Sequence, residues 1–142
     1  MAGFKLFDFT HQLLELSMRV RAARHEILSA NIANADTPGY RPRDLDFNSV
    51  MKSAVDAGET HLGTALERTD SFAKSPVDLE SAVYEPEYPD NRHGEDRLDG
   101  NAVSLDRQMA LMTENALSYE SSLTLLSRAL AGLRYAISEG RR

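Results

Sequence analysis

The chain has 142 residues, a formal net charge of −6 and a sequence pI of about 5.2. The length suits a single domain, residues 1–142, and the acidic balance leaves no positive field for phosphate groups, so no nucleic acid is expected as a partner. The absence of cysteine excludes disulfides, thiolate metal sites and cysteine nucleophiles.

The N-terminal residues MAGFKLFDF are apolar, but Lys5 and Asp8 interrupt them and no cleavage site follows. This pattern is unlike a cleaved signal peptide, and no apolar run in the chain approaches the roughly 18 residues of a membrane span. We therefore predict a flexible segment over residues 1–9 and no direct membrane span. The chain is expected either to stay in the cytosol or to be exported by a machine that reads no such signal.

A periodic apolar pattern predicts the first long helix, over residues 10–35. Its steps alternate between three and four residues, as in a coiled coil. We call this set the N-terminal stripe; it consists of Leu6, Phe9, Leu13, Leu16, Val20, Ala23, Ile27 and Ala30. Asn34 is next in phase, and Asn31 lies three residues before it. Asparagine is disfavoured inside helices, because its side chain competes for backbone hydrogen bonds, but at such a position it can fix register.

A turn segment is predicted over residues 36–47. Pro38 and Gly39 suit the two central positions of a type II turn formed by residues 37–40, and Pro38 ends the helix near Asp36. Two interpretations stay open at this point. The segment is either an ordinary helix terminus or a register device, in which case its residues are Asn31, Asn34, Thr37, Pro38, Gly39 and Tyr40.

A short amphipathic helix is predicted over residues 48–58, with Gly58 as its stop. The stretch from residue 46 to residue 101 holds thirteen acidic and five basic residues. Residues 59–99 have little periodicity and several prolines, so we predict a largely irregular acidic middle in which "AVYEPEY" is at most an edge strand.

The C-terminal segment, residues 100–142, is predicted to form the second long helix, with Ser104 as its N-cap and Gly140 at its end. Its apolar residues again follow steps of four and three. We call this set the C-terminal stripe; it consists of Leu105, Met109, Met112, Ala116, Tyr119, Leu123, Leu126, Leu130, Leu133 and Ile137.

These elements predict an all-α fold in which the two long helices pair as an antiparallel, coiled-coil-like unit and bring their stripes together. The predicted helix-packing residues are Leu13, Leu16, Val20, Ile27, Leu105, Met109, Met112, Tyr119, Leu123, Leu126, Leu130 and Leu133. Two helices alone give a thin core relative to the entropy of ordering the chain. We therefore expect the protein to be completed by packing against copies of itself or a partner.

Two segments resemble a known family. "SANIANADTPGYRPRDLDF", residues 29–47, is similar to the N-terminal signature of the axial proteins of the bacterial flagellum, which include the rod, hook and hook-associated proteins. "LDGNAVSLDRQMALMTENALSYESSLTLL", residues 98–126, resembles the matching C-terminal segment of the proximal rod proteins. The resemblance covers roughly residues 8–57 and 96–142. Ile32 and Gln108 depart from it, since leucine and an acidic residue are common there.

The resemblance implies a structural subunit of the flagellar basal body that leaves the cytoplasm unfolded through the flagellar type III export apparatus. Its implied partners in the periplasmic rod are other copies of itself, other proximal rod proteins, and the membrane-ring and rod-adaptor proteins. Phe9 and Leu13 match a candidate export motif. The two long helices would form an inner coiled-coil layer, and polar contacts across subunits, or else a solvated loop, would involve Arg41, Arg43, Asp44 and Asp46.

Other functions are favoured less. The four histidines have no metal-ligand spacing and no glycine-rich phosphate loop is present, so we expect no enzyme, no metal site and no cofactor; the histidines are His11, His25, His61 and His93. The main alternative is a cytosolic helical adaptor or secretion chaperone, which would also be acidic and two-stripe helical. Cellular location discriminates the two, because a rod subunit belongs in the basal body.

Overall fold

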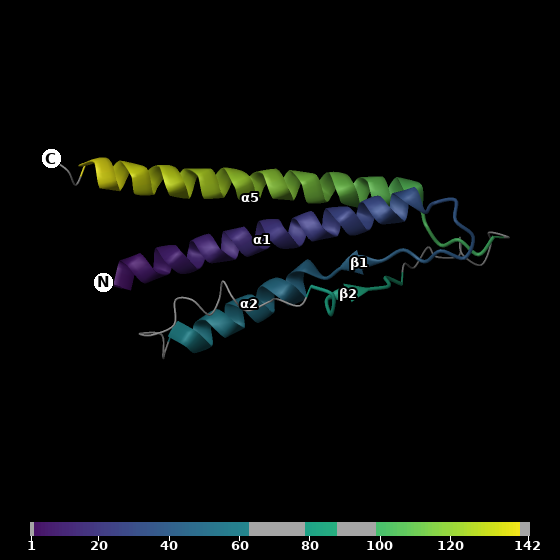
Figure 1. Cartoon of the computed structure of the whole chain (residues 1–142), viewed down its shortest axis with the longest axis horizontal. Helices are drawn as coiled ribbons and strands as arrows, with labels where there is room; N and C mark the ends of the chain where they lie inside the picture. Colours follow the sequence, from purple (N-terminus) through teal and green to yellow (C-terminus); the bar gives the residue numbers. More distant parts are fainter. Residues whose placement is uncertain (1, 63–78, 88–98, 140–142) are drawn as a thin grey trace.

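The computed structural model describes residues 2–62, 79–87 and 99–139, and the side chains of residues 10–56, 79–87 and 99–138. Helix α1 spans Ala2–Ala33, α2 spans Phe47–Leu62 and α5 spans Leu105–Glu139. Figure 1 shows α1 between the other two helices, with both running antiparallel to it. The predicted all-α fold with paired long terminal helices is confirmed.

Helix α1 has 32 residues and is about 48 Å long at about 1.5 Å per residue. It begins at Ala2, so the prediction that residues 1–9 lie outside the helix is wrong for residues 2–9. This segment contains no proline, and Gly3 costs a helix only about 1 kcal/mol. After Ala33 the helix ends in a turn with hydrogen bonds between residues three apart, since the Ala35 N–H donates to the Ile32 carbonyl at 3.1 Å.

The predicted turn follows. Gly39 has a φ of 68°, in the left-handed region, and the Tyr40 N–H donates to the Thr37 carbonyl at 3.3 Å. Both features agree with a type II turn, whose third residue needs a positive φ that glycine adopts without steric cost.

Helix α2 begins one residue earlier than predicted and continues past Gly58 to Leu62, so the prediction of a stop at Gly58 is wrong. Glycine inside a helix costs only about 1 kcal/mol, and no proline follows to end the helix. At its start, Asp46 acts as the N-cap, because its Oδ1 accepts the Ser49 N–H at 3.0 Å.

A short strand pair lies beside the start of α2. Strand β1, Asp44–Leu45, pairs antiparallel with β2, Val83–Tyr84, and Asp44 lies opposite Tyr84. The strand β2 therefore falls inside "AVYEPEY", as predicted. Much of the predicted irregular middle, residues 63–78 and 88–98, lies outside the described residues.

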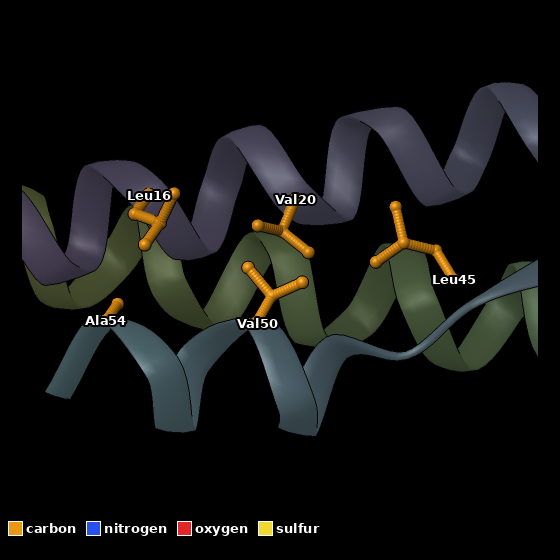
Figure 2. Close-up of a cluster of buried hydrophobic side chains, with 5 residues drawn as sticks. All are labelled: Leu16, Val20, Leu45, Val50 and Ala54. Carbon is orange, nitrogen blue, oxygen red and sulfur yellow. The ribbon is translucent and has the colours of Figure 1, made fainter. Parts of the chain in front are cut away.

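The apolar core lies between α1 and α2. Figure 2 shows its five buried side chains, which are Leu16, Val20, Leu45, Val50 and Ala54. Partly buried Leu13 and Ile27 pack against the same cluster. Burying one such aliphatic side chain contributes about 1.5–3 kcal/mol, so this cluster is the main apolar contact of the chain. The stripe residues from Leu13 to Ile27 are thus covered by α2 and Leu45, and the prediction that they pack on the C-terminal stripe is wrong.

Helix α5 has 35 residues and is about 52 Å long. The Gln108 N–H donates to the Ser104 carbonyl at 3.0 Å, which puts Ser104 at the predicted N-cap position. Asp106 lies in the first turn, where its charge is favourable to the helix dipole. In the described parts of the chain, no helix is long and apolar enough to span a bilayer.

Candidate functional site

Asn31 organises a junction where the end of α1 meets the chain after the turn and the start of α5. Its side chain is fully buried, and its Nδ2 donates to the Arg43 carbonyl at 2.6 Å and to Oε1 of Gln108 at 3.0 Å. Its Oδ1 accepts the Arg43 N–H at 3.0 Å and the Tyr40 hydroxyl at 3.1 Å. One amide therefore pairs with the backbone of Arg43, as a neighbouring strand would, and also links α1 to α5.

Asn101 caps the C-terminal end of α1 from the opposite end of the sequence. It is fully buried, and its Nδ2 donates to the carbonyls of Asn34 at 3.0 Å and Thr37 at 2.7 Å. Its Oδ1 accepts the Val103 N–H at 2.7 Å. Both carbonyls also accept a backbone N–H within the turn, from Thr37 and Tyr40 respectively, so the Asn101 amide adds a second hydrogen bond to each and ties the turn after α1 to the start of α5.

The turn before α5 lies against the turn after α1. The Gly39 N–H donates to the Asp99 carbonyl at 2.8 Å, and the Ala102 N–H donates to the Tyr40 carbonyl at 3.0 Å. Gly100 has a φ of 66°, and a Cβ built on it would lie 3.8 Å from the Gly39 Cα. Two glycine turns are thus held together by backbone hydrogen bonds.

The predicted register residues divide into two groups. Asn31, Asn34 and Tyr40 make hydrogen bonds within the chain, and Asn34 donates to the Ala30 carbonyl at 2.8 Å and accepts from the Thr37 hydroxyl at 3.1 Å. Three residues are exposed, namely Thr37, Pro38 and Gly39. Thr37 and Gly39 also form hydrogen bonds within the chain, so what distinguishes residues 37–39 is their exposed surface.

Arg24 of α1 and Asp44 of β1 form a bidentate ion pair. The Nε–Oδ1 and Nη2–Oδ2 distances are both 2.7 Å, and the side chains are 17% and 5% exposed. The hydrogen bond with Asp44 raises the pKa of Arg24, and burial together with Asp44 and Asp46 raises the pKa of Tyr84. Asp44 is therefore held inside the chain, and the prediction that it contacts another subunit is wrong.

Among the charged residues near this ion pair, Arg21 is partly buried, whereas Arg41, Arg43 and Asp46 are exposed. The Arg21 guanidinium lies 4.0 Å from the centroid of the Phe47 ring, and burial lowers its pKa. Arg41 and Glu85 approach to 3.8 Å, but both side chains are largely exposed. Arg43 and Asp46 are exposed as well, so with Arg41 they remain candidates for contacts with a neighbour.

A row of polar residues on α5, not the predicted stripe, faces α1. We call it the polar seam; its members are Gln108, Asn115 and Ser122, all buried and seven residues apart. Asn31 reaches Gln108 as described above, the Asn115 Nδ2 donates to the Arg21 carbonyl at 2.8 Å, and the hydroxyls of Ser17 and Ser122 are 3.4 Å apart. This contact joins the helices mainly through polar groups at its centre.

The C-terminal stripe lies largely in solvent. Its exposed large members are Leu105 (45%), Met109 (56%), Tyr119 (37%), Leu123 (47%), Leu130 (44%) and Ile137 (73%). Met112, Leu126 and Leu133 are half-buried. Within one chain, Leu105, Met109, Tyr119, Leu123 and Leu130 are therefore not buried against α1, and their part in helix packing stays a prediction for contacts between chains. The reason is that the polar seam, and not the stripe, matches the polar face of α1.

The candidate export motif is only partly described. Phe9 lies in α1, but its side chain is outside the described side chains, whereas Leu13 is half-buried against the core. Among the side chains that the structure describes, no group of three or more histidine, aspartate or glutamate residues could hold a metal ion.

The structural role of two residues was not predicted from the sequence, namely Asn101 and Asn115, which bind the turn after α1 and α1 itself. A signal was present: polar residues recur every seven positions from Asn101 through Gln108 and Asn115 to Ser122. This row has the same repeat as the C-terminal stripe and would have predicted a second contact face on the helix.

Comparison with known proteins identifies the family of the chain. Residues 18–41 match the family model described as "Flagella basal body rod protein". The chain is similar to the flagellar basal body rod protein FlgB of Salmonella typhimurium, at 40% identity over an alignment of 132 residues that covers 87% of this chain and 89% of that protein. It is 35% identical to FlgB of Escherichia coli over 130 residues (87% and 89%), and 34% identical to FlgB of Yersinia enterocolitica over 131 residues (87% and 90%). The chain belongs to the FlgB family of flagellar basal body rod proteins.

Proposed function

We propose that this protein is a structural, non-catalytic subunit of the proximal rod of the bacterial flagellar basal body. Membership of the FlgB family supports this role and the location in the basal body. The long helices support it too, because a rod subunit needs extended surfaces along which neighbours can pack.

The exposed C-terminal stripe is the observation that carries the assembly mechanism. Six large apolar side chains lie 37–73% exposed on one face of α5, whereas the N-terminal stripe is already covered from Leu13 to Ile27. A row of exposed large apolar side chains of this kind is typical of a protein–protein contact. On assembly, the stripe packs against neighbouring rod subunits, which include copies of this chain and other proximal rod proteins.

The junction has a supporting role in this mechanism. The amides of Asn31 and Asn101 fix where α5 begins relative to the end of α1, so the stripe is presented at a defined height and angle. Exposed residues 37–39 and the side chains of Arg41, Arg43 and Asp46 supply polar contacts to the neighbours. Contacts with the membrane ring and the rod adaptor would arise where this subunit meets the base of the rod.

The substitution Leu123→Asp tests the proposed assembly surface. Leu123 is 47% exposed, so the variant should be synthesised and should fold, but a carboxylate in an apolar contact should abolish its incorporation into purified basal bodies and with it motility. Ser121→Asp adds the same charge at an exposed position two residues away, off the stripe, and should assemble. Normal incorporation of Leu123→Asp would contradict the proposal. Recovery of the unaltered chain only from the cytosol would instead indicate an adaptor.

Export through the flagellar type III apparatus precedes assembly in this proposal. Leu13 packs against the core and Phe9 stands four residues before it, so substitutions at the two positions separate export from folding. Phe9→Ala should lower secretion of the chain, and Leu13→Ala should lower both secretion and the melting temperature. Secretion of Phe9→Ala at the normal level would remove Phe9 from the export signal.

A further inference from the structure

We propose that the polar seam of α5 fixes the rotation of this helix about its own axis and so keeps the C-terminal stripe from packing on the chain's own α1. The proposal concerns the isolated chain and goes beyond the proposed role in the rod. The underlying observation is that the more apolar face of α5 is exposed while its more polar face is buried.

The two faces of α5 are offset by one residue. Each seam residue is followed directly by a stripe residue, in the pairs Gln108–Met109, Asn115–Ala116 and Ser122–Leu123. Successive residues on an α-helix differ by about 100°, so a rotation of that size would exchange the faces. Burial of Met109 and Leu123 against α1 would then compete with the observed arrangement, because removing large apolar side chains from water is favourable.

The face of α1 that receives α5 matches the seam and not the stripe. It presents the hydroxyl of Ser17, the carbonyl of Arg21 and the amide of Asn31, which bind Ser122, Asn115 and Gln108 respectively. These contacts run along α1 from Ser17 to Asn31. A rotated α5 would leave the Asn31 Nδ2 without Gln108 and put apolar side chains against polar groups, both of which are costly when buried.

The seam is also tied to the junction that precedes α5. Asn101 is fully buried under the end of α1, and it stands seven residues before Gln108, in phase with the seam. Its hydrogen bonds to the carbonyls of Asn34 and Thr37 fix the direction in which α5 starts. Polar residues at packed helix positions are known to select one register or orientation at some cost in stability, which is the role assigned here.

Asn115 and Gln108 show that this selection has a cost. Asn115 Oδ1 and Gln108 Nε2 are buried and have no hydrogen-bond partner in the structure. An apolar side chain of similar size would avoid these losses, so stability of the isolated chain alone does not account for two amides at this interface. A requirement for one orientation does account for them.

Introduced cysteine pairs measure the rotation directly, because the natural chain has no cysteine. The first pair, Ser17→Cys with Ser122→Cys, reports the observed orientation, in which the two hydroxyls are 3.4 Å apart. The second pair, Ser17→Cys with Leu123→Cys, reports the rotated one. Under mild oxidation at high dilution, the first pair should form an intramolecular disulfide and the second should not.

The seam variant Gln108→Leu/Asn115→Leu should then permit a disulfide in the second pair, because the polar selection has been removed. The control Ala110→Leu/Thr113→Leu adds the same two side chains at exposed positions of the same helix segment and should leave that disulfide absent. Circular dichroism checks that each variant is helical. Where the double seam variant is not, Asn115→Leu, which removes a single hydrogen bond to α1, takes its place.

Two results would overturn the proposal. One is a disulfide in the second pair when the chain has its natural seam, since the rotation would then be unrestricted. The other is the absence of that disulfide in the helical seam variants, since the seam would then not be what fixes the rotation.

Discussion

The Nδ2 of Asn31 donates to Oε1 of Gln108 at 3.0 Å, and this hydrogen bond joins the last turn of α1 to the first turn of α5 across 77 positions of the sequence. Both side chains are almost completely buried. Residues from the two ends of the chain therefore build one junction, which sets the position of α5 and of the apolar stripe it carries.

Replacing Asn31 by alanine should destabilise the isolated chain by about 3 kcal/mol, because part-buried groups of Arg43 and Tyr40 and the buried amide of Gln108 would lose a hydrogen-bond partner. Equilibrium unfolding in urea measures the change. The control Asn48→Ala, at an exposed position in the first turn of α2, should stay within about 0.5 kcal/mol of the natural chain. Equal losses in the two variants would contradict the role given to Asn31.

Replacing Asn101 by aspartate tests whether donation by its amide caps α1. The carboxylate cannot donate to the carbonyls of Asn34 and Thr37, and it puts negative charge at the negative end of the α1 dipole. We expect a loss of about 2 kcal/mol and faster amide exchange at Gly39 and Ala102, whose N–H groups join the two turns. Hydrogen exchange followed by NMR reads both sites. Unchanged protection in Asn101→Asp would rule out the cap.

Removing Asp44 should cost far more than removing an exposed ion-pair partner. Asp44→Ala leaves the Arg24 guanidinium, 17% exposed, without its bidentate partner, for which a loss of about 3 kcal/mol is expected. Arg41→Ala breaks a 3.8 Å contact with Glu85 between well-exposed side chains, and a loss of about 0.5 kcal/mol or less is expected. Thermal unfolding of both variants gives the comparison. Similar shifts in melting temperature would mean that the buried pair contributes no more than a surface pair.

The hydrophobic pattern identifies the long helices because burial on one side imposes a period of three to four residues. Local turn chemistry is equally informative, since Pro38 and Gly39 fix the turn whatever packs around it. Helix ends are less predictable. Neither Gly3 nor Gly58 interrupts its helix, because a glycine costs only about 1 kcal/mol and the surrounding residues outweigh it.

The pattern does not identify what each apolar face contacts. The N-terminal stripe pairs with Val50, Ala54 and Leu45, whereas Leu123 on α5 remains exposed, although both stripes have the same spacing. The apolar spacing of a helix predicts that one of its faces is buried. It does not predict which element buries that face, and this element can belong to another chain. Asp44 likewise resembles a surface charge in the sequence, because nothing local shows that Arg24, twenty residues earlier, lies beside it.

Accessibility of a cysteine placed at Leu123 tests the central claim most directly. In the free Leu123→Cys chain, a maleimide reagent should label the new thiol readily, since Leu123 is 47% exposed and the natural chain has no cysteine. In purified basal bodies that contain the variant, the same thiol should be protected, while a control Ser121→Cys, off the stripe, should keep much more of its reactivity. Equal labelling of the Leu123→Cys variant in the free chain and in the rod would show that the stripe stays in solvent after assembly and would contradict the account.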